Sequence, residues 1–253
     1  MPDCCAVIPV YEHGATAGRV VEALRRAGLA VILVDDGSGR ASAVALDALA
    51  RSGDGVRLLR HPRNRGKGAA VQTGLAAAAA LGHSHALQVD ADGQHALADI
   101  PRFLAESRAH PEAVVCGRPV FGADAPRARL YGRRLTNFWV SVNTWSTDVP
   151  DAMCGFRVYP LAATVPLIER SRLGSRMDFD IEVLVRLHWL GVPMRWLPTA
   201  IAYPEGGRSH FRMRRDNALI TRAHTLLFFG MLARAPLLAA RKLGFPRSRD
   251  KAA

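Results

Sequence analysis

Residues 86–94 read Ala-Leu-Gln-Val-Asp-Ala-Asp-Gly-Gln, a short apolar run that ends in two aspartates. The run Ala86–Val89 predicts a buried strand. Two earlier runs have the same form: Cys5–Val10 is followed by a tyrosine, and Val31–Val34 is followed by Asp-Asp-Gly. In sheets of parallel strands, ligands bind beyond the carboxyl ends of the strands. Three strands with polar ends therefore predict a ligand site along one edge of a sheet.

The rest of the first half alternates between predicted strands and helices. Further strands are expected at Val56–Arg60 and Ala113–Cys116, and helices are expected at Thr16–Ala27, Ala41–Arg51, Gly68–Leu81 and Ile100–Ser107. This alternation predicts an α/β fold with a mostly parallel central sheet and helices on both faces. The second half predicts a helix at Leu130–Trp145, a loop at Asp151–Phe156, a helix at Phe179–Trp189 and an extended stretch at Arg195–Tyr203.

The chain has 253 residues, 49% of them hydrophobic, and a formal net charge of +12. We expect one domain over residues 1–212 and a basic, apolar helical tail over residues 213–253. The start has no secretory signal, so a cytoplasmic location is expected. No uninterrupted apolar run reaches ~20 residues, so no membrane-spanning helix is predicted. The tail either lies in the interface of the inner face of the cytoplasmic membrane or packs back on the domain.

The positive charge indicates an anionic partner, although a solvated basic surface explains it equally well. Phosphorylated small molecules, an anionic membrane and nucleic acid are the three candidate partners. The acidic pairs at the strand ends argue against nucleic acid, because an anion-binding surface would avoid them.

The aspartates that end the strand at Ala86–Val89 predict a metal site. Residues two apart at an extended strand end project to the same side, so Asp90 and Asp92 can face one ion. Gln94 can add a carbonyl oxygen. Oxygen ligands of this kind suit Mg²⁺ or Mn²⁺ held together with substrate phosphates.

Two further motifs predict contacts to a nucleotide. At 35–38, the sequence Asp-Asp-Gly-Ser places Asp36 where its carboxylate can bind a base or a ribose, or can form an Asx turn into the next helix. At 63–68, Arg-Asn-Arg-Gly-Lys-Gly opens a helix and fits beside a diphosphate. The segment lacks the P-loop spacing, and no G-x-G-x-x-G follows the first strand, which argues against a dinucleotide-binding dehydrogenase.

These motifs together resemble the inverting family-two glycosyltransferases with the GT-A fold, most closely the polyprenyl-phosphate transferases related to dolichol-phosphate mannose synthase. The resemblance covers about residues 5–212. It rests on Ile-Pro-Val-Tyr at 8–11, Val-Asp-Asp-Gly-Ser at 34–38, Arg-Asn-Arg-Gly-Lys-Gly at 63–68, Val-Asp-Ala-Asp-Gly-Gln at 89–94, Asp-Ala-Met-Cys-Gly-Phe-Arg at 151–157, Phe-Asp-Ile-Glu at 179–182 and Gly-Arg-Ser-His at 207–210.

The resemblance implies a site for a UDP- or GDP-sugar. The implied nucleotide-binding residues are Pro9, Tyr11, Val34, Asp36, Lys67, Asp90 and Ala91, and the implied metal ligands are Asp90, Asp92 and Gln94. The candidate clamp for an acceptor phosphate consists of Arg118, Arg129, Arg133 and Arg208. The chain departs from the family where Glu-His follows the tyrosine of the first motif, and where Pro204 and His210 replace an Arg and a Lys.

The implied reaction is a single displacement with inversion onto a lipid-linked or other membrane-associated acceptor, with Asp92 counted as catalytic through the ion. An acceptor phosphate needs no strong base, because its second pKa is about 6. A hydroxyl acceptor needs one, and Asp151 and then Asp178 are the candidates. The alternatives are transfer to a hydroxyl, a sugar nucleotidyltransferase, whose Gly-rich loop the chain lacks, and a basic module without enzymatic activity.

Overall fold

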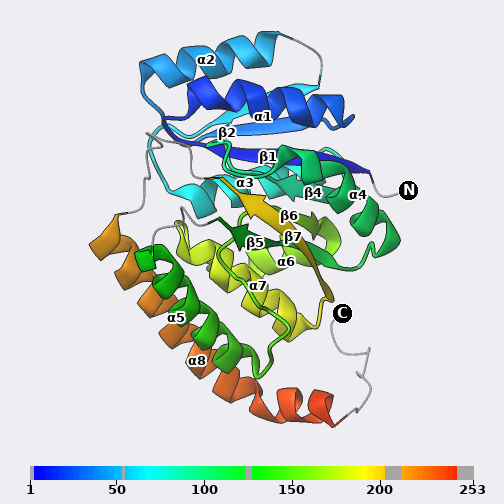
Figure 1. Cartoon of the computed structure of the whole chain (residues 1–253), viewed down its shortest axis with the longest axis vertical. Coiled ribbons are helices and arrows are strands. Elements are labelled where there is room, and N and C mark those ends of the chain that lie inside the picture. The colour runs from blue at the N-terminus through cyan, green and yellow to red at the C-terminus, as the bar shows by residue number, and fades with distance from the viewer. Residues whose placement is uncertain (1–2, 53–54, 123–126, 203–211, 244–253) are drawn as a thin grey trace.

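The computed structural model describes residues 3–52, 55–122, 127–202 and 212–243, apart from the side chains of 127–129. A seven-stranded sheet in the order β3-β2-β1-β4-β6-β5-β7 forms the centre (Figure 1). The strands are β1 (Cys4–Val10), β2 (Val31–Asp35), β3 (Val56–Arg60), β4 (His85–Gln88), β5 (Val114–Phe121), β6 (Arg157–Pro160) and β7 (Met194–Ile201). Strands β3, β2, β1 and β4 are parallel, as predicted, and β5 is parallel to β7.

Eight α-helices and a 3₁₀ turn are found among the described residues. They are α1 (Gly14–Arg26), α2 (Arg40–Arg51), α3 (Lys67–Ala80), η1 (Leu97–Asp99), α4 (Ile100–Ala109), α5 (Arg127–Thr144), α6 (Leu161–Arg170), α7 (Asp178–Leu190) and α8 (Met213–Lys242). Helices α1, α2 and α4 share one buried apolar cluster with the sheet, and α3, α6 and α7 share the other. The sheet is thus covered on both faces, which confirms the predicted α/β class.

The strand register sets the position of the polar strand ends. In the parallel ladder Val10 lies opposite Asp35, and Asp35 lies opposite Arg60. The residues that follow β1 and β2 therefore leave the sheet at one edge. The loop between β1 and α1 is fastened there by Glu12, whose carboxylate accepts a hydrogen bond of 2.8 Å from the backbone N–H of Gly39.

Strand β6 and helix α6 were not predicted. Strand β6 runs antiparallel to both β4 and β5, so the sheet is mixed beyond β4. Its first residue, Arg157, is fully buried, although arginine normally indicates an exposed position. The guanidinium donates to the backbone carbonyls of Ala152 and Asp180 and to the hydroxyl of Tyr159 at 2.8–3.1 Å. These partners satisfy the buried charge, and the sequence did not show that they converge.

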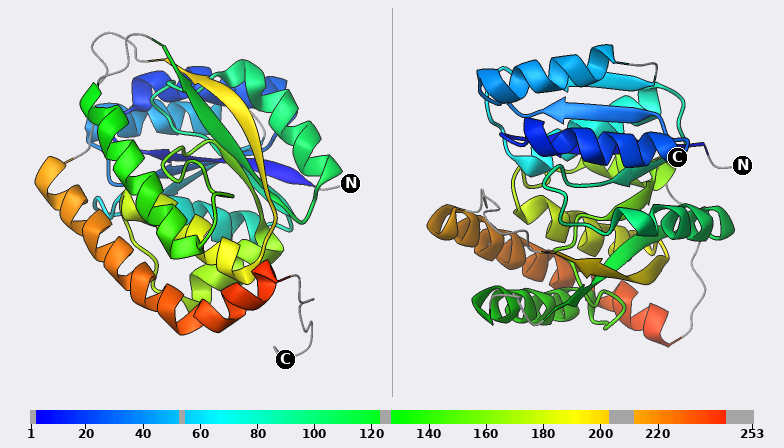
Figure 2. Two further views of the ribbon diagram at one scale, coloured as in Figure 1. Left: turned by 60° about the horizontal axis from the view of Figure 1, so that its bottom comes forward. Right: turned by 45° about the horizontal axis from the view of Figure 1, so that its top comes forward.

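Helices α5 and α8 form an outer layer that packs on α7 (Figures 1 and 2). The inner face of α8 is buried, including Ala223, Leu227 and Met231. Its outer face exposes large apolar side chains: Leu226, Phe229, Leu232 and Leu237. The tail therefore packs back on the domain and also presents an apolar surface. By length and composition α8 is also able to cross a membrane, contrary to the prediction of no such helix, although 28% of its most apolar window is buried.

Candidate functional site

A small cleft of about 80 Å³ lies beyond the carboxyl ends of β1 and β2. Four of the predicted nucleotide-binding residues line it: Pro9, Tyr11, Asp36 and Lys67. Asn64 and Arg176 also line it, and the guanidinium of Arg176 donates to the Asn64 amide oxygen at 3.3 Å. The structure thus brings together most of the residues that the motifs predicted for the nucleotide.

Asp36 shapes the wall of this cleft. Its carboxylate accepts hydrogen bonds from the backbone N–H groups of Arg65 and Gly66, at 2.9 and 2.7 Å, and pairs with Nδ1 of His61 at 2.7 Å. The other ring nitrogen of His61 lies 3.0 Å from the hydroxyl of Thr73 on α3. Asp36 therefore holds the 63–68 loop at the start of α3. His61 was missed, since nothing in the sequence distinguishes it from a surface histidine.

Lys67 joins the cleft to a second, larger cavity. Its ammonium lies 2.9 Å from the carboxylate of Asp90 and 3.1 Å from that of Asp180. Burial alone would lower the pKa of Lys67, but these two carboxylates raise it above its usual range. Gly155 closes over the group, because a Cβ there would lie 2.7 Å from the Lys67 nitrogen. Asp180 stood in a predicted motif but was not among the predicted site residues.

The aspartate pair lines one end of the large cavity. Asp90 and Asp92 both face it, although the segment at Ala91 and Asp92 is a turn rather than the expected strand end. Burial alone would raise the pKa of Asp90, but the Lys67 ammonium and the imidazole of His95 hold it well below its usual range. Asp90 is thus held in its charged form at the cavity wall, and the Asp92 carboxylate accepts a hydrogen bond of 3.0 Å from the backbone N–H of Gln94.

The donor set at this end fits a divalent cation. Asp90 Oδ1 is buried and has no hydrogen-bond partner among the described residues. In that part of the chain, no group of three or more His, Cys, Asp or Glu is arranged to hold a metal by itself. A site with so few protein ligands still suits Mg²⁺ or Mn²⁺, because these ions bind through one or two carboxylates and complete their coordination shell with phosphates and water. Gln94 lines the same cavity and is the third candidate ligand.

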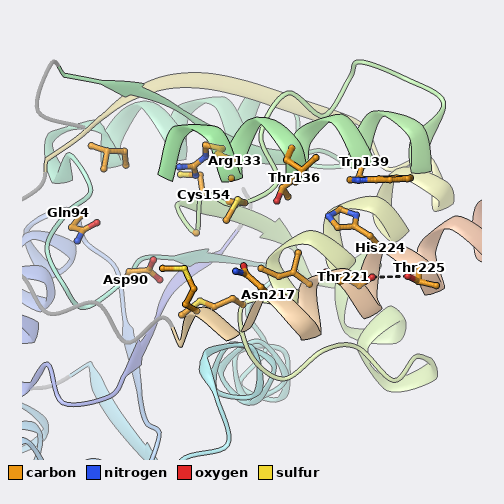
Figure 3. Close-up of a pocket in the computed structure, with 18 of the residues that line it drawn as sticks. Asp90, Gln94, Arg133, Thr136, Trp139, Cys154, Asn217, Thr221, His224 and Thr225 are labelled. Carbon is orange, nitrogen blue, oxygen red and sulfur yellow. Dashed lines mark hydrogen bonds between the residues drawn. The ribbon is translucent and has the colours of Figure 1, made fainter. Parts of the chain in front are cut away.

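The cavity extends from the aspartates into the space between α5 and α8 and has a volume of about 1130 Å³. Figure 3 shows Asp90 and Gln94 at one end, with Arg133 next to them, and Trp139 and His224 at the other. Most of the remaining lining is apolar, and it includes Leu135, Ile220 and Phe228. An elongated amphiphile with its charged group near Arg133 fits this shape.

Arg133 and Asp151 were predicted for different roles, and the structure pairs them. The guanidinium makes two hydrogen bonds to the carboxylate, at 2.5 and 3.2 Å. Asp151 is buried and also accepts from the backbone N–H groups of Met153 and Cys154. A carboxylate with this many donors organises the loop that carries Gly155, and both of its oxygens are already engaged.

The other predicted site residues line neither the small cleft nor the large cavity, or lie outside the described residues. Val34 and Ala91 are core residues, and the carbonyl of Ala91 accepts from the hydroxyl of Thr16 at 2.7 Å. Asp178 accepts from the backbone N–H of Arg176 at the start of α7 and lines neither space. Arg118 is exposed on β5, outside the cavity lining. Two predicted residues, the side chain of Arg129 and all of Arg208, lie outside the described residues, as do Pro204 and His210.

Two histidines of the cavity were also missed. His95 is buried, stacks on Phe156 with the ring centroids 5.2 Å apart, and lies 3.4 Å from the Asp90 carboxylate. His224 lies at the far end on α8. The sequence around these two histidines gives no sign of a site, because each acquires its role from side chains on other elements.

Comparison with known proteins gives consistent matches. The family model described as Glycosyl transferase family 2 matches residues 5–164. The chain is 31% identical to the dolichyl-phosphate beta-glucosyltransferase of Mus musculus over 175 residues, which is 65% of this chain and 53% of that protein. It is 26% identical to the enzyme of the same name from Dictyostelium discoideum over 65% of this chain and 52% of that protein. The chain thus spans about half the length of these relatives.

Solved structures share the fold at low sequence identity. The glucosyl-3-phosphoglycerate synthase of Mycobacterium tuberculosis, in complex with phosphoglyceric acid, matches with a TM-score of 0.65 at 15% identity, over 98% of this chain and 82% of that one. The same synthase with Mn²⁺, UDP-glucose and phosphoglyceric acid gives a TM-score of 0.64 at 14% identity, with the same coverage. S. aureus TarS with UDP-GlcNAc gives 0.58 at 14% identity, over 98% and 74% of the two chains. These likenesses confirm the predicted GT-A fold.

Proposed function

The chain belongs to glycosyl transferase family 2, and from this premise we propose that it transfers a sugar from a UDP- or GDP-sugar to a lipid-linked phosphate acceptor. The observation that carries the proposal is that one cavity joins the aspartate pair to an apolar passage. One end holds Asp90 and Asp92, and the body is an apolar passage between α5 and α8. A lipid-linked acceptor has matching parts, a charged head and an apolar chain. The dolichyl-phosphate beta-glucosyltransferases among the relatives support the same class of acceptor.

The donor is assigned to the small cleft and to the charged end of the cavity. Pro9, Tyr11 and Asp36 line the cleft, where a base and a ribose would bind. The diphosphate would then reach Asp90 and Asp92, since Lys67 lines the cleft and contacts Asp90. A Mg²⁺ or Mn²⁺ ion held by Asp90, Asp92 and Gln94 would neutralise the charge that develops on the leaving diphosphate.

The reaction is a single displacement. An oxygen of the acceptor phosphate attacks the anomeric carbon and forms the new carbon–oxygen bond. The bond to the diphosphate oxygen breaks, its electron pair leaves with the nucleoside diphosphate, and the configuration inverts. The acceptor phosphate is largely ionised near pH 7, so no strong base is required. The pairing of Asp151 with Arg133 supports this acceptor over a hydroxyl, which would need a free base.

The site of action is proposed to be the inner face of the cytoplasmic membrane. The exposed apolar side chains of α8 lie beside those of α5, where Tyr131 and Phe138 are 73% and 60% exposed. Arg134 on α5 and Arg222 on α8 are also exposed. Apolar and basic side chains on one layer are typical of a surface that binds anionic lipid.

The test is a donor and acceptor panel. The purified chain is incubated with UDP- and GDP-sugars and Mn²⁺, with decyl phosphate or decanol as acceptor, and release of nucleoside diphosphate is measured. We expect release that depends on Mn²⁺ with one donor, and faster release with the phosphate than with the alcohol. If nucleoside diphosphate is released only with the alcohol, the acceptor is a hydroxyl and the proposed phosphate acceptor is wrong. No release, and no metal-dependent thermal shift with any nucleotide, would overturn the enzymatic proposal.

A further inference from the structure

The far end of the large cavity contains a histidine that the proposed reaction does not use. His224 on α8 lies seven residues beyond Asn217, which also lines the cavity, a separation of about 10 Å along a helix. In Figure 3 its imidazole projects from α8 into the space below Trp139 of α5. The centroids of these two rings are 6.5 Å apart. His224 is therefore placed to contact a bound molecule well away from the reacting phosphate.

One nitrogen of His224 lacks a hydrogen-bond partner. The side-chain amide nitrogen of Asn143 lies 3.2 Å from Nδ1, and with Nδ1 as the acceptor of this hydrogen bond the proton of the neutral imidazole is on Nε2. His224 is only 8% exposed, and Nε2 is buried with no partner among the described residues. A buried donor without an acceptor is costly, which makes such an atom a good candidate for binding a ligand.

The surroundings of His224 favour a ligand group that is uncharged and accepts a hydrogen bond. Burial lowers the pKa of the His224 imidazole to about 4, so it is uncharged near pH 7. The charged side chains among the described lining residues are Asp90, Asp92 and Arg133. Figure 3 shows Asp90 and Arg133 toward the opposite end of the cavity, and Asp92 follows Asp90 by two residues. A second anionic group at His224 would lack a cation to balance it. A hydroxyl, ether or carbonyl oxygen would meet the Nε2 donor without that cost.

We propose that His224 is a specificity-determining residue that donates a hydrogen bond to a neutral oxygen on the body of the acceptor, away from its phosphate. This inference rests on the proposed function, because it takes the phosphate end of the acceptor to lie near Arg133. It narrows the acceptor from any lipid phosphate to an amphiphile with a polar group partway along its apolar chain. A plain hydrocarbon chain would cover Nε2 and leave it unpaired.

The test measures binding without requiring transfer. Dodecyl phosphate and isomers that carry one hydroxyl at successive chain positions are titrated into the full chain, with calorimetry as the readout and tryptophan fluorescence as a second one. We expect one isomer to bind about fivefold more tightly than dodecyl phosphate, the size of one hydrogen bond. His224→Leu should remove this preference, and His224→Gln, which retains an N–H donor, should restore part of it.

A matched control is available on the same helix. Thr225 also lines the cavity, but its hydroxyl already donates to the carbonyl of Thr221 at 3.0 Å, so Thr225→Val should keep the preference. Equal binding of all isomers, or a preference that survives in His224→Leu, would overturn the inference even if sugar transfer is demonstrated. Failure of every phosphate to bind would overturn it as well. Absence of nucleoside diphosphate release alone would count against the proposed function and leave the binding result standing.

Discussion

The small cleft at Asp36 and the large cavity between α5 and α8 differ in how their polar atoms are satisfied. In the cleft, Asp36 is bonded to two backbone N–H groups and to His61, and Lys67 is bonded to two carboxylates. In the cavity, three buried atoms have no partner in the described part of the chain: Asp90 Oδ1, His95 Nδ1 and His224 Nε2. The two spaces meet at Met177, which lines both.

This difference separates two kinds of binding surface. A site whose polar groups are already paired is rigid before the ligand arrives, which lowers the ordering cost of binding. A site with unpaired buried donors and acceptors gains the most when a ligand supplies the missing partners. We infer that the cleft is shaped in advance for the nucleotide, and that the cavity is completed by the ion and by the acceptor.

The largest expected effect is at the ion end of the cavity. Asp92→Asn keeps the shape of the side chain and removes one of the two carboxylates, so nucleoside diphosphate release should fall on the order of 10³-fold. Binding of the donor nucleotide should lose its dependence on Mn²⁺, as measured by calorimetry with and without the ion. Asp99→Asn is the matched control, since Asp99 pairs with Arg102 at the start of α4 and lines neither space. Normal Mn²⁺-dependent affinity in Asp92→Asn would remove Asp92 from the site.

The second effect tests whether the Arg133–Asp151 pair is part of the framework of the cavity. The side chains are 19% and 5% exposed, so Arg133→Met leaves a buried carboxylate unpaired and should lower the free energy of unfolding by about 4 kcal/mol. Adding Asp151→Asn removes that charge and should recover part of the loss. Urea unfolding of the two single variants and the double variant measures the coupling. Strictly additive losses would show that the pair is not coupled and would return Asp151 to the list of candidate bases.

The fold was predictable where local sequence decides it. Strand β3 has the predicted bounds Val56–Arg60, and each predicted helix of the first half overlaps an observed one. Burial of continuous apolar runs and the alanine-rich composition of α3 suffice there. Strand β6 was not predictable, because Arg157 is stabilised inside the core by the carbonyl of Ala152 in the preceding loop and by that of Asp180 on α7.

The candidate site also has parts that local sequence predicts and parts that only tertiary packing decides. Asp36, Asp90 and Asp92 follow apolar strands, so their common edge could be inferred from the pattern alone. The Arg133–Asp151 pair and the role of His224 depend on how α5, α8 and the loop before β6 pack together. Tertiary contacts of this kind leave no periodic signal in the sequence. The family motifs therefore located the residues of the small cleft better than the contacts of the large cavity.

The third effect is a pH dependence that arises at the far end of the cavity. Burial lowers the pKa of His224 from 6.5 to about 4, so the unfolded chain binds a proton there at a higher pH than the folded chain. The neutral imidazole of His224 contributes at most about 3 kcal/mol to the free energy of unfolding. This contribution is fully present above pH 6.5 and is lost as the pH falls through 4. His224→Gln cannot titrate, so the difference between its unfolding curve and that of the wild type should change between pH 6.5 and 4. A constant difference over that range would contradict a buried, neutral imidazole.

The smallest effect concerns the outer layer, where the cavity would meet a membrane. Leu232→Glu places a charge on the exposed apolar face of α8, where Leu232 is 48% exposed. Binding to vesicles that contain anionic lipid should weaken about fivefold, because one apolar contact is lost and the new carboxylate is repelled. Val44→Glu is the control, since Val44 is 57% exposed on α2, on the opposite side of the sheet (Figure 1). Equal binding of both variants in a sedimentation assay would leave α8 with a packing role alone, whereas a loss confined to Leu232→Glu would place the open side of the acceptor cavity against the lipid.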